Sequence, residues 1–221
     1  MGLTRICAWG RVNGVRLQWG PIHTPEPASA PPEGLRPIEA PASRRAYSLA
    51  VLAGIVLLAG LCSALSAWSW FTRGPQGIAT ASDAASPWIA ATISLVLFVP
   101  LHEIVHLLGQ PGFGGTSQSV LMVWPSRLRF GVYYEGCISR SRWLAMRLAP
   151  FVVLSVLPAC LVAILQFWPW TGDVEVGLQV MMLANTLGSG GDIVAALLVL
   201  RQVPPTGELC FQSGRAYWRP A

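Results

Sequence analysis

Apolar residues gather in four long segments after residue 46. No charged residue lies between Arg45 and Arg73, and further apolar runs cover residues 84–101, 148–172 and 176–200, the last interrupted only by Asp192. About 20 helical residues cross a bilayer core, so each segment is long enough, the second once it continues through residue 108. The pattern predicts an all-α membrane protein in which four transmembrane helices form one domain over residues 47–200.

The chain has a different composition outside these helices. Residues 21–43 are rich in proline, alanine and glutamate and contain little that a core would bury. Such a segment cannot offset the entropy that folding removes. Residues 1–46 are therefore expected to be a disordered cytoplasmic tail without a cleavable signal peptide, since no apolar stretch precedes the proline-rich part. Residues 201–221 are expected to be a second cytoplasmic tail.

The connection between the second and third helices carries another periodicity. Residues 119–124 (SVLMVW) and 127–134 (RLRFGVYY) are rich in β-branched and aromatic residues and flank a Pro125-Ser126 turn. They predict a short β-hairpin-like insertion. Two interpretations stay open. Either the free strand pairs with an extended peptide substrate, or the hairpin only lies on the lipid headgroups.

Composition agrees with a membrane protein and argues against other classes. Of the 221 residues, 53% are hydrophobic and 11% are charged, whereas soluble domains contain about 25% charged residues. All fifteen basic residues are arginine, and no basic stripe alternates with aromatic residues, so no nucleic-acid partner is expected. The five cysteines include no C-x-x-C pair, so neither a thiolate zinc site nor a redox motif is indicated.

Arginine lies mainly on one side of the expected helices. The first tail, the connection between the second and third helices and the C-terminus contain Arg44, Arg45, Arg127, Arg129, Arg140, Arg142, Arg201, Arg215 and Arg219, whereas the opposite flanks contain Arg73. Arginine is enriched in cytoplasmic loops. We therefore expect an integral protein of the bacterial cytoplasmic membrane with both termini in the cytoplasm.

The second helix contains the sequence H-E-x-x-H, in which His102 and His106 are one helical turn apart. Two imidazoles on one helical face can bind a single zinc ion, and Glu103 beside them can take a proton from a water molecule. The alternative is a pair of histidines that satisfy the backbone or each other near a helix end. Ionisable groups inside a membrane need a partner, a metal or a function, which favours zinc, with Glu103 as the general base.

A catalytic zinc site uses three protein ligands. The remaining histidine, His23, lies in the expected tail, and Asp192 is the one acidic residue of the four helices besides Glu103. The second and fourth helices run in the same direction, and His102 and Asp192 lie at similar distances from their starts, so the two side chains are expected at similar depth. Asp192 is therefore predicted to be the third ligand.

The segment before Asp192 is rich in glycine. Gly188, Gly190 and Gly191 are expected to weaken the fourth helix and to let its backbone approach a neighbour. Asn185 lies about two turns before Asp192, and two roles stay open for its amide. It hydrogen-bonds a substrate carbonyl or oxyanion, or it connects helices within a packing face of small residues.

Three motifs carry a resemblance to a known family. HEIVH at 102–106, RLAPF at 147–151 and N-x-x-G-S-G-G-D at 185–192 resemble the zincin peptidase family called domain of unknown function 3267 (DUF3267). That family is similar to site-2-type intramembrane zinc metalloproteases. The resemblance covers roughly residues 87–200, including the hairpin-like connection.

The resemblance implies a zinc ion bound by His102, His106 and Asp192, with Glu103 as the general base. It departs from the site-2 pattern, in which the last ligand helix usually carries an Asn-Pro motif and an Asp-Gly pair. Here Gly188 replaces the proline-like break. In the same helix, Ile193 follows Asp192.

The leading hypothesis is a membrane-embedded zinc metallopeptidase of the HExxH, site-2-protease-like type, which hydrolyses peptide bonds of a membrane protein or peptide in or next to the bilayer. A second hypothesis is a non-catalytic zinc-site protein, or degenerate protease, that binds client transmembrane segments; the intact Glu103 argues against it. Metal transport is disfavoured, because the outer halves of the second and fourth helices offer Thr92, Ser94 and Gln179 but no charge to line a path. A purely structural bundle gives no reason for ionisable groups to converge at one depth.

Overall fold

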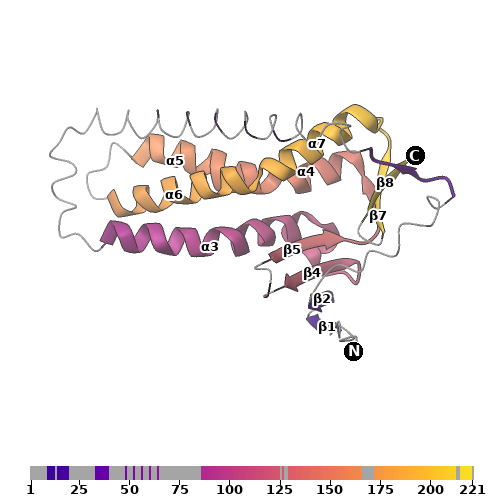
Figure 1. Ribbon diagram of the computed structural model, residues 1–221, viewed down its shortest axis with the longest axis horizontal. Coiled ribbons are helices and arrows are strands. Elements are labelled where there is room, and N and C mark those ends of the chain that lie inside the picture. Colours follow the sequence, from indigo (N-terminus) through magenta and orange to yellow (C-terminus); the bar gives the residue numbers. More distant parts are fainter. Residues whose placement is uncertain are drawn as a thin grey trace. The chain divides into compact units, whose positions relative to one another are not determined.

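A computed structural model gives the fold of the chain (Figure 1). It describes residues 9–12, 14–19, 33–39, 86–124, 126, 129–165, 172–212 and 215–220, together with the single positions 48, 52, 56, 60 and 64. The chain divides into two compact units: Met1–Ala40, Glu103–Arg147 and Ala195–Ala221 form unit 1, and Pro41–His102 and Leu148–Val194 form unit 2. Helices α3 (Ser86–Gly109), α4 (Arg140–Phe151) and α7 (Gly190–Gln202) each continue from one unit into the other.

Unit 2 is built from apolar helices. Besides its parts of α3, α4 and α7, it contains the π-helix η3 (Val152–Val156), α5 (Leu157–Leu165) and α6 (Gly172–Gly188). Gly177 lets α3 approach α6, since a Cβ atom at Gly177 would lie 3.2 Å from the Ser94 hydroxyl oxygen and 3.7 Å from Ala90 Cβ. Ser155 of η3 donates a hydrogen bond to the Met182 carbonyl at 3.4 Å. The helix α6 therefore contacts both α3 and η3.

Two described helices are long and apolar enough to cross a membrane, Trp88–Gly109 and Arg140–Leu165. Val174–Gly188 and Gly190–Gln202 meet the same criteria as one span that is bent by 48°. The helix α3 presents large apolar side chains outward, among them Trp88, which is 76% exposed, and Val96, which is 67% exposed. Such a surface is typical of a helix that faces lipid, where all backbone polar groups are satisfied within the helix. Within the described residues, two or three helices can therefore span a membrane, judged by length and composition.

The first sheet of unit 1 contains β1 (Trp9–Val12), β2 (Val15–Trp19), β4 (Ser119–Trp124) and β5 (Arg129–Tyr134), in the order β1-β2-β4-β5. The pairs β1–β2 and β4–β5 are antiparallel, whereas β2 and β4 are parallel, with Leu17 opposite Leu121. The tight turn between β1 and β2 depends on Gly14, whose φ of +87° is unfavourable for other residues. Strand β5 lies at the edge of this sheet (Figure 1).

The second sheet of unit 1 contains β3 (Arg36–Pro37), β8 (Arg215–Arg219), β7 (Glu208–Gln212) and β6 (Cys137–Ser139), in the order β3-β8-β7-β6. All its pairs are antiparallel. Apolar side chains of β6 and β7 pack against the parts of α4 and the C-terminal end of α7 that belong to unit 1. The buried cluster consists of Ile138, Trp143, Met146, Val199, Val203 and Leu209.

A disulfide joins β6 to β7. Cys137 and Cys210 lie opposite each other in the strand register, and their sulfur atoms are 2.02 Å apart. The cysteine spacing contained no sign of this pair. Disulfides persist in oxidising compartments and are rare in the cytosol, so the bond does not agree with the cytoplasmic location that arginine predicts for this part of the chain. The orientation of the termini stays a prediction.

The expectation of an all-α protein is supported only in part, because two sheets form in unit 1 beside the helices. The hairpin between the second and third predicted helices is confirmed as β4 and β5. The sequence pattern missed the larger sheets because each is completed by strands that are distant along the chain, and such pairing leaves no local signal. The second and third predicted spans are confirmed by length and composition, and the fourth is bent. The first predicted span, 46–72, lies outside the described residues apart from single positions.

The expectation of disordered tails is wrong where strands form. Strands β1, β2 and β3 lie within residues 1–46, and β7 and β8 lie within residues 201–221. These strands bury side chains that the composition of the segments concealed: Gln18 is 2% exposed, Leu209 is 3% exposed and Tyr217 is 9% exposed. The proline-rich residues 20–32 lie outside the described residues.

Tyr133 links β5 to β2 and has a perturbed ionisation. Its ring is 8% exposed, and its hydroxyl donates a hydrogen bond to Gln18 Oε1. Burial, and secondly the negative charge of Glu135, raise the pKa of Tyr133 from 10.0 to about 12, although Arg16 acts in the opposite direction. The neutral phenol is therefore favoured in the folded sheet.

This shift predicts a specific alkaline transition. In an absorbance titration, one tyrosine should ionise near pH 12, and Tyr133→Phe should remove that step. Because the phenol ionises at lower pH in the unfolded chain, the free energy of unfolding should fall as pH rises from about 10 through 12. The control Tyr217→Phe should leave the step in place. A step that persists in Tyr133→Phe would contradict the assignment.

Candidate metal centre

His102 and His106 lie on one face of α3, near the end of the apolar helix. Both imidazoles are buried, at 7% and 4% exposure. The helix ends at Gly109 because Pro111 follows and does not continue a helix. Gly109 also packs closely on α4, since a Cβ atom there would lie 3.1 Å from Met146 Cα. Because His102 and His106 are four residues apart, their imidazoles lie one above the other on the same face of α3. The close packing of α3 on α4 holds this face in place.

Asp192 completes a group of three buried side chains that can share one metal ion. Nε2 of His102 and Oδ2 of Asp192 are 3.1 Å apart. One ligand atom each from His102, His106 and Asp192 lies within 4.8 Å of the others. Asp192 occupies the first turn of α7, directly after the bend at Ser189. The structure therefore brings together the three residues that the sequence analysis proposed as ligands.

The tautomer of His106 follows from its hydrogen bond. Its Nδ1 atom lies 2.9 Å from the Met146 carbonyl oxygen. Because a carbonyl only accepts, the proton is on Nδ1, and the lone pair of Nε2 is available to a metal. Four residues after Met146, Pro150 lies inside α4 and has no backbone N–H to donate to that carbonyl. The proline therefore leaves the Met146 carbonyl as an acceptor for His106.

His102 is oriented in the same way by Asn185, whose Oδ1 atom lies 2.8 Å from Nδ1 of His102. The amide nitrogen of Asn185 donates to the Pro150 carbonyl at 3.0 Å and to the Ser155 hydroxyl at 2.8 Å. The amide oxygen must therefore face His102, which donates from Nδ1. Both amide hydrogens are engaged within the protein, which favours the helix-connecting role of Asn185. Its oxyanion role stays a prediction.

These tautomers make the group suitable for zinc. With Nδ1 protonated, the Nε2 atom of His102 carries a lone pair and faces the Asp192 carboxylate. Two acceptor atoms then face each other, and a metal cation or a second ring proton between them stabilises this arrangement. Two imidazole nitrogens and one carboxylate oxygen are a common ligand set of catalytic zinc, and they leave the fourth position of a tetrahedral site open. Ligand atoms of such a site are about 3.3 Å apart, close to the 3.1 Å between His102 and Asp192. The residues present therefore fit zinc.

Glu103 follows His102 directly in α3 and is half-buried. Its Oε2 atom accepts a hydrogen bond of 2.8 Å from the backbone N–H of Val132 in β5. The carboxylate of the predicted general base is thus held by the edge strand of the first sheet.

Sequence reasoning named the side chains of this site but missed the backbone groups that hold them. Val132 provides an N–H to Glu103, and Met146 provides a carbonyl to His106. No residue-type pattern marks such groups, because every residue carries them. One signal was present: Pro150 within RLAPF, since a helical proline frees the carbonyl four residues earlier.

A family model described as "Putative zincin peptidase" (DUF3267) matches residues 95–206. This range includes the three grouped residues, Glu103 and Asn185. No curated protein and no solved structure matches the chain. A zincin is a zinc enzyme, so the matched family and the ligand set both indicate zinc as the cofactor.

Loss of one ligand should weaken zinc binding. The unchanged protein should contain about one zinc per chain, and Asp192→Ala should lower the zinc affinity by more than about 100-fold, because removal of a group that only supports a ligand already costs 10- to 100-fold. Zinc content by mass spectrometry and competition with a chelator measure this. Glu175→Gln is a matched control, because Glu175 is another buried carboxylate, 5% exposed, outside the group of three. Full zinc content in Asp192→Ala would exclude Asp192 as a ligand.

Pro150 should raise the zinc affinity of the protein without raising the stability of its fold. In Pro150→Ala, the restored N–H competes with His106 for the Met146 carbonyl, so zinc affinity should fall by about 10-fold. The zinc-free protein should be no less stable to heat, because proline is unfavourable inside a helix. Pro158→Ala, eight residues later in α5, should leave zinc affinity unchanged. Equal zinc affinity in the two variants would refute the orienting role of Pro150.

Proposed function

Because the chain belongs to the DUF3267 family of zincin peptidases, we propose that it is a membrane-embedded zinc metallopeptidase that hydrolyses peptide bonds in or next to the bilayer. One observation carries the proposal: His102 and His106 of α3, a helix that exposes apolar residues, form a buried ligand group with Asp192 of α7. Glu103 directly follows His102 in the sequence. The substrate is a membrane protein or a peptide at the membrane surface.

Each residue of the site has a role in this reaction. Zinc, when bound, supplies Lewis acidity, which polarises the scissile carbonyl and makes a water molecule a better nucleophile near neutral pH. Glu103 accepts a proton from that water and passes it to the leaving amide nitrogen as the C–N bond breaks. The carboxylate of Asp192 balances positive charge, and the hydrogen bonds at Nδ1 keep both imidazoles in the required tautomer.

The position of the ligands on α3 supports hydrolysis near one face of the bilayer. His102 lies fourteen residues after Trp88, where the candidate span begins, which corresponds to about 21 Å of helix. The span ends at Gly109, one turn after His106. The ligands therefore lie toward that end of the span. A transmembrane substrate must unwind before cleavage, because the carbonyls of a helix are hydrogen-bonded within it.

The edge strand β5 supports the interpretation in which an extended substrate pairs with the hairpin. The backbone N–H of Val132 is directed at Glu103 and not at β4. In an antiparallel pair, the residues whose backbone groups bond to the partner strand alternate with residues whose backbone groups face away from it. The backbone groups of Phe130, Val132 and Tyr134 therefore face away from β4. An extended peptide can add to such an edge through main-chain hydrogen bonds. We propose that substrate pairs here, next to the general base.

The role of Glu103 is tested by Glu103→Ala. The full-length variant in lipid nanodiscs should keep about one zinc per chain and cleave membrane peptides at least about 100-fold more slowly, the lower range for loss of a general base. Mass spectrometry of the peptides measures cleavage. Glu175→Gln should cleave at the unchanged rate.

Two results would contradict the proposal. Full cleavage by Glu103→Ala would remove Glu103 from the mechanism. If the unchanged zinc-loaded chain binds membrane peptides but cleaves none of them, the protein is the non-catalytic binder of the second hypothesis.

A further inference from the structure

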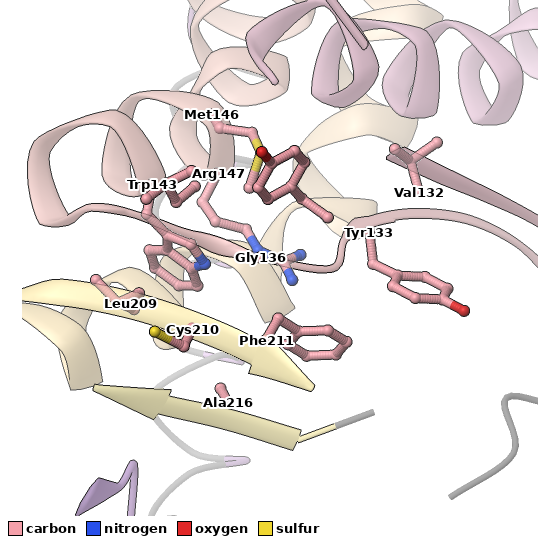
Figure 2. A pocket seen from close by; sticks show the side chains of 12 residues that line it. Val132, Tyr133, Gly136, Trp143, Met146, Arg147, Leu209, Cys210, Phe211 and Ala216 are labelled. Atoms are coloured by element: carbon pink, nitrogen blue, oxygen red, sulfur yellow. The ribbon is translucent and has the colours of Figure 1, made fainter. Parts of the chain in front are cut away.

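The pocket of unit 1 is too small to hold part of a substrate. Figure 2 shows it among Trp143, Arg147 and Phe211. Its volume of about 20 Å³ has room for about one water molecule. Groups that contact a peptide during the proposed reaction therefore have to come from other residues.

Ser189, in unit 2, carries a buried hydroxyl that makes no hydrogen bond within the described part of the chain. The residue is 0% exposed, and its Oγ atom has no hydrogen-bond partner. A serine hydroxyl inside a helix often donates to the carbonyl four residues earlier. Here the Asn185 carbonyl accepts only the backbone N–H of Ser189, at 2.8 Å. Because buried polar groups are nearly always hydrogen-bonded, such a hydroxyl indicates a functional role or a bound molecule.

Ser189 lies on the face of its helix that holds His102. The Oδ1 atom of Asn185 lies 2.8 Å from Nδ1 of His102, and Oδ2 of Asp192 lies 3.1 Å from Nε2. Helical hydrogen bonds continue across the bend, because Ile193 N–H donates to the Ser189 carbonyl at 3.0 Å. Side chains three and four residues apart are neighbours on a helix. Ser189 therefore lies between Asn185 and Asp192, beside the imidazole that both contact.

The bend leaves room for a peptide next to Asp192. Gly188 and Gly191 are exposed. Apart from Gly191's own stretch of helix, no described atom lies within 4 Å of a Cβ atom placed at this glycine. Asp192 and Ser189 are buried beside this opening. Burial suits a group that acts on a reacting oxygen, because the exclusion of water strengthens its hydrogen bond.

We propose that the Ser189 hydroxyl donates a hydrogen bond to the oxygen of the scissile carbonyl in the transition state of peptide hydrolysis. The inference rests on the proposed peptidase function and names a further catalytic residue for it. When water adds to the carbonyl carbon, an electron pair of the C=O bond moves to the oxygen, and a donor already in place stabilises the negative charge. As the C–N bond breaks, this pair returns to the carbonyl. The leaving nitrogen takes the proton that Glu103 accepted from the water, and Ser189 keeps its own proton.

Ser189 offers a donor that Asn185 has already used elsewhere. The amide nitrogen of Asn185 donates to the Pro150 carbonyl and to the Ser155 hydroxyl. A developing oxyanion needs a donor, which the remaining amide oxygen of Asn185 does not provide. The hydroxyl one turn later, on the same face, has its proton available.

The experiment uses the full-length, zinc-loaded chain in lipid nanodiscs and the membrane peptide that the unchanged chain cleaves fastest. Ser189→Ala should lower kcat by about 100- to 1000-fold, the range for loss of one such donor. The zinc affinity should stay within about 3-fold. The affinity for the peptide, compared between Glu103→Ala and Glu103→Ala combined with Ser189→Ala, should also stay within about 3-fold, because the bond forms only in the transition state.

A second measurement does not depend on cleavage. In a phosphinic analogue of the same peptide, a tetrahedral phosphinate with a negatively charged oxygen replaces the scissile amide. It should bind to Ser189→Ala about 10- to 100-fold more weakly than to the unchanged chain, the range for a hydrogen bond to a charged group. Ser119→Ala is the matched control, because Ser119 is also 0% exposed but its hydroxyl pairs with Thr116 at 3.0 Å. It should cleave the peptide and bind the analogue as the unchanged chain does.

The outcomes separate this inference from the peptidase proposal. Unchanged cleavage or unchanged phosphinate binding in Ser189→Ala overturns the role of Ser189 and leaves the peptidase proposal standing. A fall in zinc affinity of about 10-fold or more in Ser189→Ala, the effect of losing a group that supports a ligand, means that the hydroxyl orients Asp192 instead, and it overturns the inference as well. If the unchanged chain cleaves no membrane peptide, the peptidase proposal is wrong and the inference falls with it.

Discussion

Two hydrogen bonds at Nδ1 determine what this site can do. The Met146 carbonyl and the Asn185 amide oxygen each accept a hydrogen bond from the Nδ1–H of a histidine of α3, and each bond leaves Nε2 as the nitrogen with a lone pair. Without them, either imidazole is free to adopt the tautomer in which Nε2 carries the proton and no longer binds a metal. The grouping with Asp192, the fit to zinc and the use of Glu103 as a base all depend on these two acceptors.

Both acceptors depend on an irregular stretch of one helix. Pro150 interrupts the hydrogen-bond ladder of α4, and the π-helix η3 begins two residues later. The first irregularity frees the Met146 carbonyl for His106, and the Pro150 carbonyl accepts a hydrogen bond from the Asn185 amide nitrogen. Short π-segments occur often at functional sites. Here a local loss of helix regularity supplies hydrogen-bond acceptors for His106 and for Asn185.

The side chains of the site could be predicted from the sequence, because few ionisable residues occur in the apolar segments. H-E-x-x-H fixes the spacing of two imidazoles on a helix, and Asp192 stood out as an acidic residue in an apolar run. The hairpin of β4 and β5 was also predictable, since its two strands are adjacent in the sequence. The break at Ser189 agrees with the weakening expected from the neighbouring glycines.

Other parts of the fold could not be predicted, because they depend on pairing between distant segments. Strand β2 pairs with β4, about 100 residues later, and β6 pairs with β7, about 70 residues later. A tail segment with few apolar residues looks disordered on its own but folds when another strand offers backbone partners.

The Cys137–Cys210 bond joins two points that are 73 residues apart. The covalent ring that it closes contains α4, η3, α5, α6 and α7, and hence Asn185 and Asp192, whereas both histidines of α3 lie outside it. One backbone cleavage within the ring, by this enzyme or another, would leave the fragments tethered through sulfur. The nicked molecule would then keep its acidic ligand within reach of α3 until a reductant released it.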